Sequence, residues 1–220
     1  MHPFPKSALA ILIFASILVA TACGSSSAQI RLLNAFPSQS SLDMLIDSKS
    51  TATAVAYAAA SGYSSVSPGS RHLQIEATGT STVLADQTIS LGSGTSSTVL
   101  ATNSGTTVLT DSNTTPASGN FTIRVINASS TLGTADIYIV SSGTDISTVS
   151  PNYSSVAFAS ATGYSSLTPG SYQVIFTLPG QKFASISSSP TSFSSGQVRT
   201  VAGLDGQNGG FTMAVIADKN

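Results

Sequence analysis

The chain contains little cysteine, histidine or charge, and it has no tryptophan. Its one cysteine, Cys23, cannot form a disulfide within the chain. Because the chain has two histidines, the sequence argues against a histidine-rich metal site and against a Ser-His-Asp triad. Charged residues make up 8% of the chain, against about 25% in ordinary globular proteins. Eight basic and nine acidic residues form no basic patch, so the sequence argues against nucleic-acid binding.

Sequence motifs for common enzyme classes are also missing. Neither a G-x-S-x-G nor a G-x-G-x-x-G pattern occurs, and no phosphate-binding loop is present. His72 falls at a polar position of an expected strand, which favours a solvated side chain. Asp145 and Asp205 have no close acidic neighbours and are expected to be solvated loop carboxylates. We therefore expect no enzyme, no metal site and no cofactor.

The N-terminal segment is typical of an export signal. Lys6 precedes an apolar run at 8–20, and small residues separate that run from Cys23. A basic start, an apolar run of this length and small residues at the end describe a secretory signal peptide. The run is too short for a comfortable membrane span.

Residues 19–23 resemble the lipobox of bacterial lipoproteins, in which the cysteine is lipidated and becomes the mature N-terminus. Ala20 stands where that motif prefers leucine, so a cut by ordinary signal peptidase is the alternative. The resemblance implies a lipid on Cys23 as the membrane partner, and Gly24 in place of aspartate implies the outer membrane of the cell envelope. We expect a signal peptide at 1–22 and a flexible tether at 23–28.

A nine-residue phrase occurs twice in the remaining chain, at 62–70 and 163–171, with two conservative differences. The matched positions that we single out are Gly62, Tyr63, Pro68 and Gly69 in the first copy and Gly163, Tyr164, Pro169 and Gly170 in the second. Pro-Gly predicts a type II turn in which glycine supplies the positive φ. Each tyrosine is expected to be a core aromatic whose hydroxyl caps a backbone group, as in a tyrosine corner. The repeated phrase indicates two homologous halves.

Arginine and aspartate recur at identical spacing in the two halves, as Arg31 with Asp43 and Arg124 with Asp136. If the first two strands of each half pair, the arginine and the aspartate could meet across the ladder and set the register. The functional alternative is a carboxylate site for calcium or a sugar. One aspartate in each half offers few of the oxygens that calcium requires.

The spacing of apolar runs and turn signals predicts an all-β protein with two tandem immunoglobulin-like β-sandwiches. We place the first at 29–111 and the second at 120–220, joined by a short linker at 112–119 that holds them end to end. Each half is expected to have about seven or eight strands. The alanine-rich stretch 52–60 and its counterpart 154–161 are predicted as strands rather than helices.

These features resemble the DUF4397 family, a domain of unknown function found in bacterial envelope proteins. The resemblance rests on the opening patterns at 30–37 and 123–130, on the aspartates that follow them, and on the repeated turn phrase. It implies an immunoglobulin-like sandwich on an exported protein, present in two copies, with no agreed biochemical activity. Asn34 and Asn127 stand where the family usually has histidine, which weakens any metal or general-base role at that position.

The expected function is a structural or interaction module of the cell envelope, adhesion-like and anchored by its lipid. The alternative is a receptor for a glycan or another small ligand. Exposed aromatic side chains at one loop end would favour the receptor, and Tyr153 and Phe158 lie beside eight extra residues around 142–152 of the second half. The partner is therefore a protein or a glycan, besides the membrane.

Overall fold

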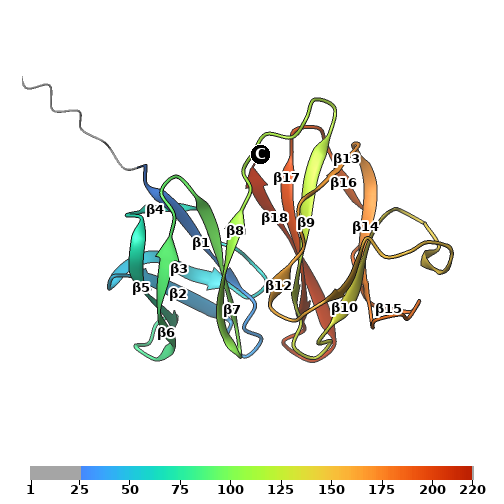
Figure 1. The fold of residues 1–220 in the computed structure, drawn as a ribbon. Helices are drawn as coiled ribbons and strands as arrows, with labels where there is room; N and C mark the ends of the chain where they lie inside the picture. The colour runs from blue at the N-terminus through green and yellow to red at the C-terminus, as the bar shows by residue number, and fades with distance from the viewer. Residues whose placement is uncertain (1–25, 220) are drawn as a thin grey trace, which may run out of the picture.

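The computed structural model describes residues 26–219, and it shows an all-β protein built from two sandwich-like halves (Figure 1). The predicted signal peptide and Cys23 lie outside the described residues. Within the described range, no helix has the length and apolar character needed to cross a bilayer. The all-β prediction is confirmed.

The first half has eight strands in the described part of the chain. They are β1 (Ala28–Asn34), β2 (Ser41–Ile46), β3 (Lys49–Ala56), β4 (Ser64–Val66), β5 (Gly69–Ala77), β6 (Val83–Leu91), β7 (Ser96–Thr102) and β8 (Gly105–Asp111). One sheet has the order β4-β1-β7-β8, and the facing sheet has the order β3-β2-β5-β6. Consecutive strands β1 and β2 therefore lie in different sheets.

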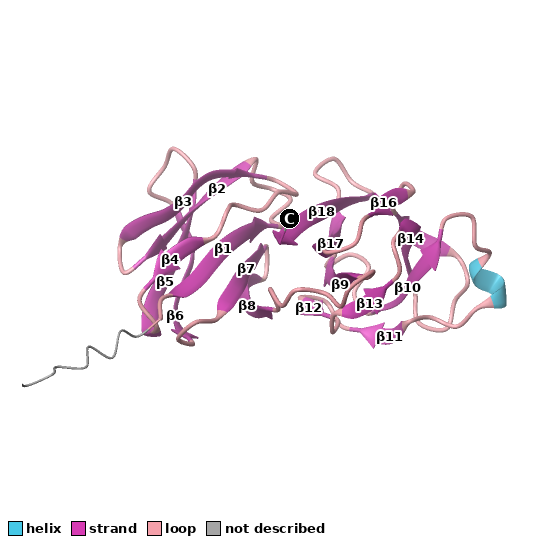
Figure 2. Ribbon diagram, turned by 90° about the horizontal axis from the view of Figure 1, so that it is seen from above, coloured by secondary structure: helices cyan, strands magenta, loops and turns pink. Residues whose placement is uncertain are grey.

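The second half repeats this arrangement with more, shorter strands. They are β9 (Phe121–Ala128), β10 (Ala135–Ser141), β11 (Tyr153–Val156), β12 (Ser160–Ala161), β13 (Ser165–Leu167), β14 (Gly170–Thr177), β15 (Ala184–Ser187), β16 (Thr191–Phe193), β17 (Val198–Asp205) and β18 (Phe211–Lys219). One sheet joins β12 and β13 to β9, β17 and β18, and the other joins β11, β10, β14, β15 and β16. A 3-10 helix, η1 (Ile146–Thr148), lies in the expected insertion and projects from the far end of the molecule (Figure 2).

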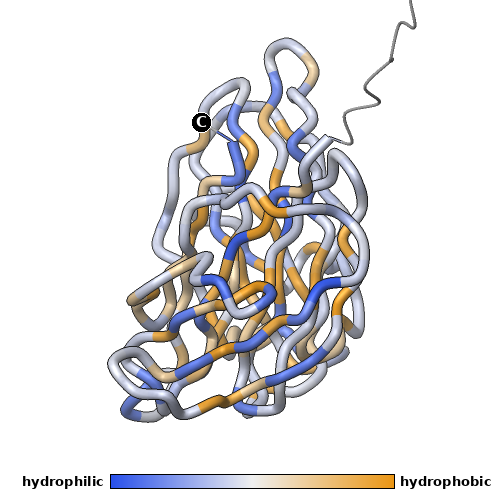
Figure 3. The backbone as a smooth tube through the Cα atoms, turned by 90° about the vertical axis from the view of Figure 1, so that its left-hand side faces the viewer, coloured by the Kyte–Doolittle hydropathy of each residue, from blue (hydrophilic) through white to orange (hydrophobic). Residues whose placement is uncertain are grey.

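In the sheet that lies farthest from the second half, buried and more exposed side chains alternate along β2. Every second residue of this strand is buried, namely Leu42, Met44 and Ile46. The same alternation is visible as changing colour along the strands nearest the viewer in Figure 3. Apolar side chains on one face of such a strand pack into the sandwich, while the polar face remains in water.

The strands between the halves behave differently, because both of their faces are buried. β1, β7, β9 and β17 are buried along almost their whole length. One face fills the sandwich of its own half, and the other face packs against the opposite half. The shared cluster between the halves includes Leu33, Leu100, Ile126, Leu204 and Ile216. The halves therefore lie face to face, so the predicted end-to-end arrangement is wrong.

The ends of the strands refine the predicted boundaries. Ala28 is buried and begins β1, and the carbonyls of Ser26 and Ser27 accept hydrogen bonds from Gly94. The tether predicted to reach residue 28 therefore ends earlier. The stretches 52–60 and 154–161 contain strands joined by turns and no helix.

Candidate functional site

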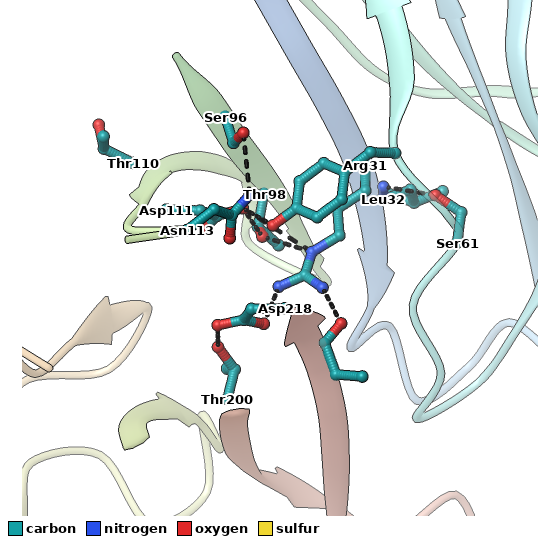
Figure 4. A network of polar contacts seen from close by, with 12 residues as sticks. Arg31, Leu32, Ser61, Ser96, Thr98, Thr110, Asp111, Asn113, Thr200 and Asp218 are labelled. Atoms are coloured by element: carbon teal, nitrogen blue, oxygen red, sulfur yellow. Dashed lines mark hydrogen bonds and ion pairs between the residues drawn. The ribbon is translucent and has the colours of Figure 1, made fainter. Parts of the chain in front are cut away.

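Two buried arginines link the halves of the chain, and Figure 4 shows the contacts of one of them, Arg31. The guanidinium of Arg31 in β1 donates to the Asp218 carboxylate of β18 at 2.5 Å and to the Ala217 carbonyl at 3.0 Å. Arg124 in β9 makes the reverse connection, because it donates to the Asp111 carboxylate and, at 3.0 Å, to the Thr110 carbonyl. Each half thus contributes one arginine and one aspartate. We call these four residues and their hydroxyl partners the reciprocal network.

Threonine and tyrosine complete each side of the reciprocal network in the same way. Thr98 accepts from Arg31 Nε at 2.8 Å and donates to Asp111 at 2.7 Å. Thr200 accepts from Arg124 Nε at 2.9 Å and donates to Asp218 at 2.6 Å. A contact that is made twice with exchanged roles is the property of an isologous interface.

The repeated tyrosines belong to the same network. The Tyr63 hydroxyl donates to Asp111 at 2.5 Å, and the Tyr164 hydroxyl donates to Asp218 at 2.7 Å. Their rings lie under the guanidinium groups, with Arg31 Cζ 4.6 Å and Arg124 Cζ 5.1 Å from the ring centroids. The predicted backbone cap is wrong, because each hydroxyl bonds a carboxylate. The predicted inward position of the rings agrees with their partial burial.

Burial and charge shift the ionisation of this network. Burial would lower the pKa of Arg31, but the charge of Asp218, with Tyr63 and Asp111, outweighs it and raises that pKa. Burial raises the pKa of Tyr63 well above its ordinary value, and the hydrogen bond to Asp111 adds to the effect. Burial likewise raises the pKa of Tyr164, beside Asp218. These shifts keep Arg31 charged and keep Tyr63 and Tyr164 neutral in the folded protein.

The expected pairing of Arg31 with Asp43 and of Arg124 with Asp136 is wrong. The first two strands of each half lie in opposite sheets, so they form no ladder across which these side chains could meet. Asp43 instead accepts the backbone N–H of Ala54 at 2.7 Å, and Asp136 accepts that of Ser155 at 2.7 Å.

The residues capped by these aspartates have left-handed backbone conformations. Ala54 has φ of 50° and Ser155 has φ of 53°, and the pairing of each strand shifts register nearby. Thr78 adds a second donor to Asp43, and the Gly180 N–H adds one to Asp136. Both donors of Asp43 reach its Oδ1, whereas the two donors of Asp136 reach one carboxylate oxygen each. Among residues 26–219, no group of three potential ligands is placed to hold a metal.

The asparagines that replace the family histidine are also structural. Asn34 donates to the Val55 carbonyl at 3.0 Å, and Asn127 donates to the Val156 carbonyl at 2.9 Å. Both side chains are fully buried. Each fixes the turn that follows its strand by accepting a backbone N–H two residues later.

The two Pro-Gly turns differ. Both connect a short strand of one sheet to a long strand of the other, as β4 to β5 and β13 to β14. Gly69 has φ of 101°, as a type II turn requires, but Gly170 does not have a positive φ. The prediction of positive φ is therefore wrong for Pro169-Gly170. Nothing in the structure explains the glycine at Gly62 and Gly163, since an added Cβ would meet no atom within 4 Å.

The remaining candidate carboxylates separate into exposed and buried groups. Asp145 is exposed and caps η1 through the Ser147 N–H, and the hydrogen bonds of Ser147 lower its pKa. His72 lies 2.6 Å from Asp86 on an open face, as expected for a solvated histidine. Asp205 was expected in solvent, yet it is buried at the end of β17, where it accepts from Ser130 N at 3.0 Å. Burial alone would raise the pKa of Asp205, but hydrogen bonds from 129–131 lower it.

The exposed aromatic platform beside the insertion that would favour a receptor is not formed by Tyr153. Tyr153 packs against the core of the second half, and its hydroxyl donates to the Gly163 carbonyl at 3.1 Å. Phe158 is half-buried. Both rings are therefore partly buried.

Exposed apolar side chains gather instead around β15 and β18. Phe183 is 81% exposed, Leu178 is 49% exposed and Val215 is 47% exposed. A hollow of about 610 Å³ lies between the two strands and is lined by Ser185, Ile186, Ser187, Ser188, Ser189, Thr191, Phe211, Thr212, Met213 and Val215. A second hollow of about 510 Å³ adjoins it at Ser185 and is lined by Leu178, Pro179, Gln181 and Phe183. We call the two hollows together the open corner; no charged side chain lines either one.

Comparison with known families identifies the chain. The profile of the family described as Domain of unknown function (DUF4397) matches residues 28–138, half of the chain. The protein belongs to the DUF4397 family. The match covers the first half and continues into β10 of the second. No match was found among curated proteins.

Two solved structures have a weak likeness to this DUF4397 protein. One is the carbohydrate-binding module CBMbc (family CBM26) from Eubacterium rectale Amy13K, in complex with maltoheptaose, with 12% identity and a TM-score of 0.29 over 88% of this chain and 98% of that chain. Another is a proposed adhesin from Bacteroides ovatus, with 9% identity and a TM-score of 0.20 over 89% of this chain and 93% of that chain. Likeness at this level assigns neither a ligand nor an activity to this protein.

The sequence analysis missed both aspartates of the reciprocal network, Asp111 and Asp218, as well as Thr98 and Thr200. Asp111 ends β8 and Asp218 is the last residue but one of β18, and they follow the similar runs Val108-Leu109-Thr110 and Val215-Ile216-Ala217. That shared pattern of two apolar residues, a spacer and an aspartate is the signal that could have found the two aspartates.

Proposed function

We propose that this protein is a lipid-anchored interaction module of the cell envelope, exposed from the outer membrane, with two tandem DUF4397 units acting as one body. The observation that carries the proposal is the combination of the buried reciprocal network with the uncharged open corner. The network makes the halves a single unit, while the corner leaves apolar side chains in solvent. Contiguous exposed apolar surface is typical of an interaction site.

The second DUF4397 unit is supported by matched details beyond the family profile. Arg124, Asp136 and Tyr164 make the same classes of contact as Arg31, Asp43 and Tyr63. Unrelated sandwiches would have no reason to share a capped bulge, a buried asparagine and a stacked arginine. We therefore treat residues 120–220 as the second copy.

Binding rather than catalysis is favoured by the state of the buried carboxylates. Asp111, Asp136, Asp205 and Asp218 all accept hydrogen bonds from protein donors. A general base needs a lone pair directed at substrate in an accessible cleft. We propose no enzymatic activity for this protein.

The anchor is tested by the mass of the mature N-terminus and by fractionation of cells. The wild-type protein should carry diacyl or triacyl mass on Cys23 and partition with the membrane, whereas Cys23→Ala should abolish both. Deletion of the gene should change adhesion or envelope integrity. An unmodified N-terminus would contradict the anchor, and a deletion strain unchanged in both assays would contradict the interaction role.

Glycan binding is the second candidate, and Phe183 is the observation that favours it. Phe183 is 81% exposed and lines the smaller hollow, which shares Ser185 with the hydroxyl-rich hollow. Aromatic faces with nearby hydroxyl groups suit uncharged sugars. A glycan array probed with the purified protein should show hits that Phe183→Ala removes, while an array without hits excludes this candidate.

A further inference from the structure

The two halves differ most clearly where the open corner lies. In the first half, one continuous strand of nine residues, β6, pairs with β5. In the second half its place is taken by two short strands, β15 and β16, which are interrupted at 188–190. Pro190, which has no backbone N–H, ends this interruption.

The pairing registers identify which side chains correspond. Arg71 pairs with Ile89, and its counterpart Tyr172 pairs with Thr191, so Thr191 replaces Ile89. Ile75 pairs with Ala85, and its counterpart Phe176 pairs with Ile186. The preceding residues therefore match as well, and Ser185 replaces Leu84.

These two replacements remove apolar side chains that close the corner of the first half. Ile89 is buried in the first core, and Leu84 and Val108 pack against that core. In the second half, the smaller polar Ser185 and Thr191 line a hollow of about 610 Å³. Val215, which matches Val108 by its pairing with β17, is 47% exposed there. Two of the residues that line the hollow thus stand at positions where the other half has a leucine and an isoleucine.

The chemistry of the hollow selects an uncharged, partly apolar occupant. Phe211, Met213 and Val215 form its apolar side, and serine and threonine hydroxyls form the other. A charged group placed there would lose water without gaining a counter-charge. β15 and β18 each end their sheet among the described strands, so each offers an edge to an extended chain.

We propose that the open corner binds an extended peptide segment of a partner protein and that two aliphatic side chains of this segment fill the hollow. This inference rests on the proposed role as an interaction module and specifies the chemistry of its partner. The first half supplies the template, because at the matching positions Leu84 and Ile89 of a strand pack in its core. Addition of an extended segment at a sheet edge, with side chains in pockets, is an established mode of peptide recognition.

The test uses the protein purified from the envelope and a fluorescent peptide with the sequence of residues 83–91, the strand that serves as template. A control peptide carries serine and threonine at the positions of Leu84 and Ile89. In anisotropy titrations, the first peptide should bind at least about tenfold more tightly, because each buried aliphatic side chain contributes about that factor or more. Equal binding of the two peptides would overturn the proposal.

Filling the hollow provides the decisive variant. The double substitution Ser185→Leu with Thr191→Ile restores the packing of the first half and should weaken peptide binding by about tenfold or more. Ser192→Leu is the matched control, because Ser192 lies in the same strand but does not line the hollow. It should leave binding unchanged. Retained binding in the filled variant would place the peptide elsewhere and overturn the proposal.

A second, milder variant tests the same hollow in case the double substitution prevents folding. Val215→Thr keeps the size of an exposed side chain while making the hollow more polar, and it should weaken peptide binding by a few fold. If the filled variant loses glycan capture or self-association but keeps peptide binding, the occupant is a sugar or a second copy and the peptide assignment fails. The peptide assay is independent of Cys23, so a failed anchor test and a failed peptide test remain distinguishable.

Discussion

Arg31 lies in the first strand of the protein and donates to Asp218 in the last described strand, 187 positions along the chain. Arg124 and Asp111 repeat this relationship with the halves exchanged. Because all four side chains are buried, each charge depends on its partner in the other half. The network therefore couples the stability of one half to the position of the other.

Removing one arginine should strongly destabilise the whole protein. Arg31→Met leaves the Asp218 carboxylate buried without its cation, and we expect a loss of about 3–5 kcal/mol in the free energy of unfolding. Urea denaturation measures this change. Arg71→Met is the control, since Arg71 pairs with Asp47 at a partly exposed site, and its loss should stay below about 1 kcal/mol. Equal losses in the two variants would show that the buried pair is not what joins the halves.

Alkaline pH should weaken the fold through the network tyrosines. The pKa of Tyr63 is raised in the folded protein above its ordinary 10.0, so the unfolded chain ionises first. The stabilising contribution is complete below pH 10 and is lost as pH rises above it, by up to about 1.4 kcal/mol per pH unit for each such tyrosine. Unfolding curves of wild type and Tyr63→Phe between pH 8 and 11 measure the difference. The free energy of unfolding of Tyr63→Phe should decline less steeply with rising pH than that of the wild type. An equal decline in the two proteins would contradict this account.

The repeated aspartates should matter for stability and not for calcium. Asp43→Ala removes the acceptor for the Ala54 N–H and Thr78 hydroxyl, and we expect a loss of about 1–3 kcal/mol. Asp136→Ala should behave alike. Millimolar calcium should leave the melting temperature of the wild type unchanged, as followed by calorimetry. A calcium-dependent rise that Asp43→Ala or Asp136→Ala removes would restore the alternative of a metal site.

Glycine should stabilise the left-handed alanines. Ala58 and Ala159 have φ of 57° and 58°, a conformation that costs an L-residue about 1–2 kcal/mol. Ala58→Gly should raise the free energy of unfolding by about 0.5 kcal/mol after the extra chain entropy of glycine is counted. Ala52→Gly, at a buried strand position without positive φ, is the control and should be destabilising. Thermal unfolding distinguishes the two, and a destabilised Ala58→Gly would contradict the strain argument.

Much of the fold could be predicted because each strand carries its own pattern. Leu73 and Ile75 after the first turn phrase, and Val174 and Phe176 after the second, are buried as their alternation indicates. The partners of Arg31 and Arg124 could not be predicted in this way. Spacing along the chain suggested nearby aspartates, but a crossing between sheets separates those residues and brings distant ones together.

The open corner could not be predicted from local sequence patterns either. Ser185 and Thr191 are ordinary strand residues in sequence. Only the pairing registers show that they occupy the positions of Leu84 and Ile89 in the first half. The sequence likewise left open whether Tyr153, beside the insertion, is exposed, and the structure packs it against the core. Position near an insertion does not determine which side of a strand faces the core.

The sequence by itself determined the all-β class, the DUF4397 resemblance, the repeated turn phrase and the poverty of catalytic groups, because these depend on residue identity and short-range periodicity. Only the tertiary structure decided that the halves pack face to face through doubly buried strands and exchange their arginine–aspartate partners. Burial on both faces and contacts across 187 positions depend on how sheets stack. No local period along the chain encodes that stacking.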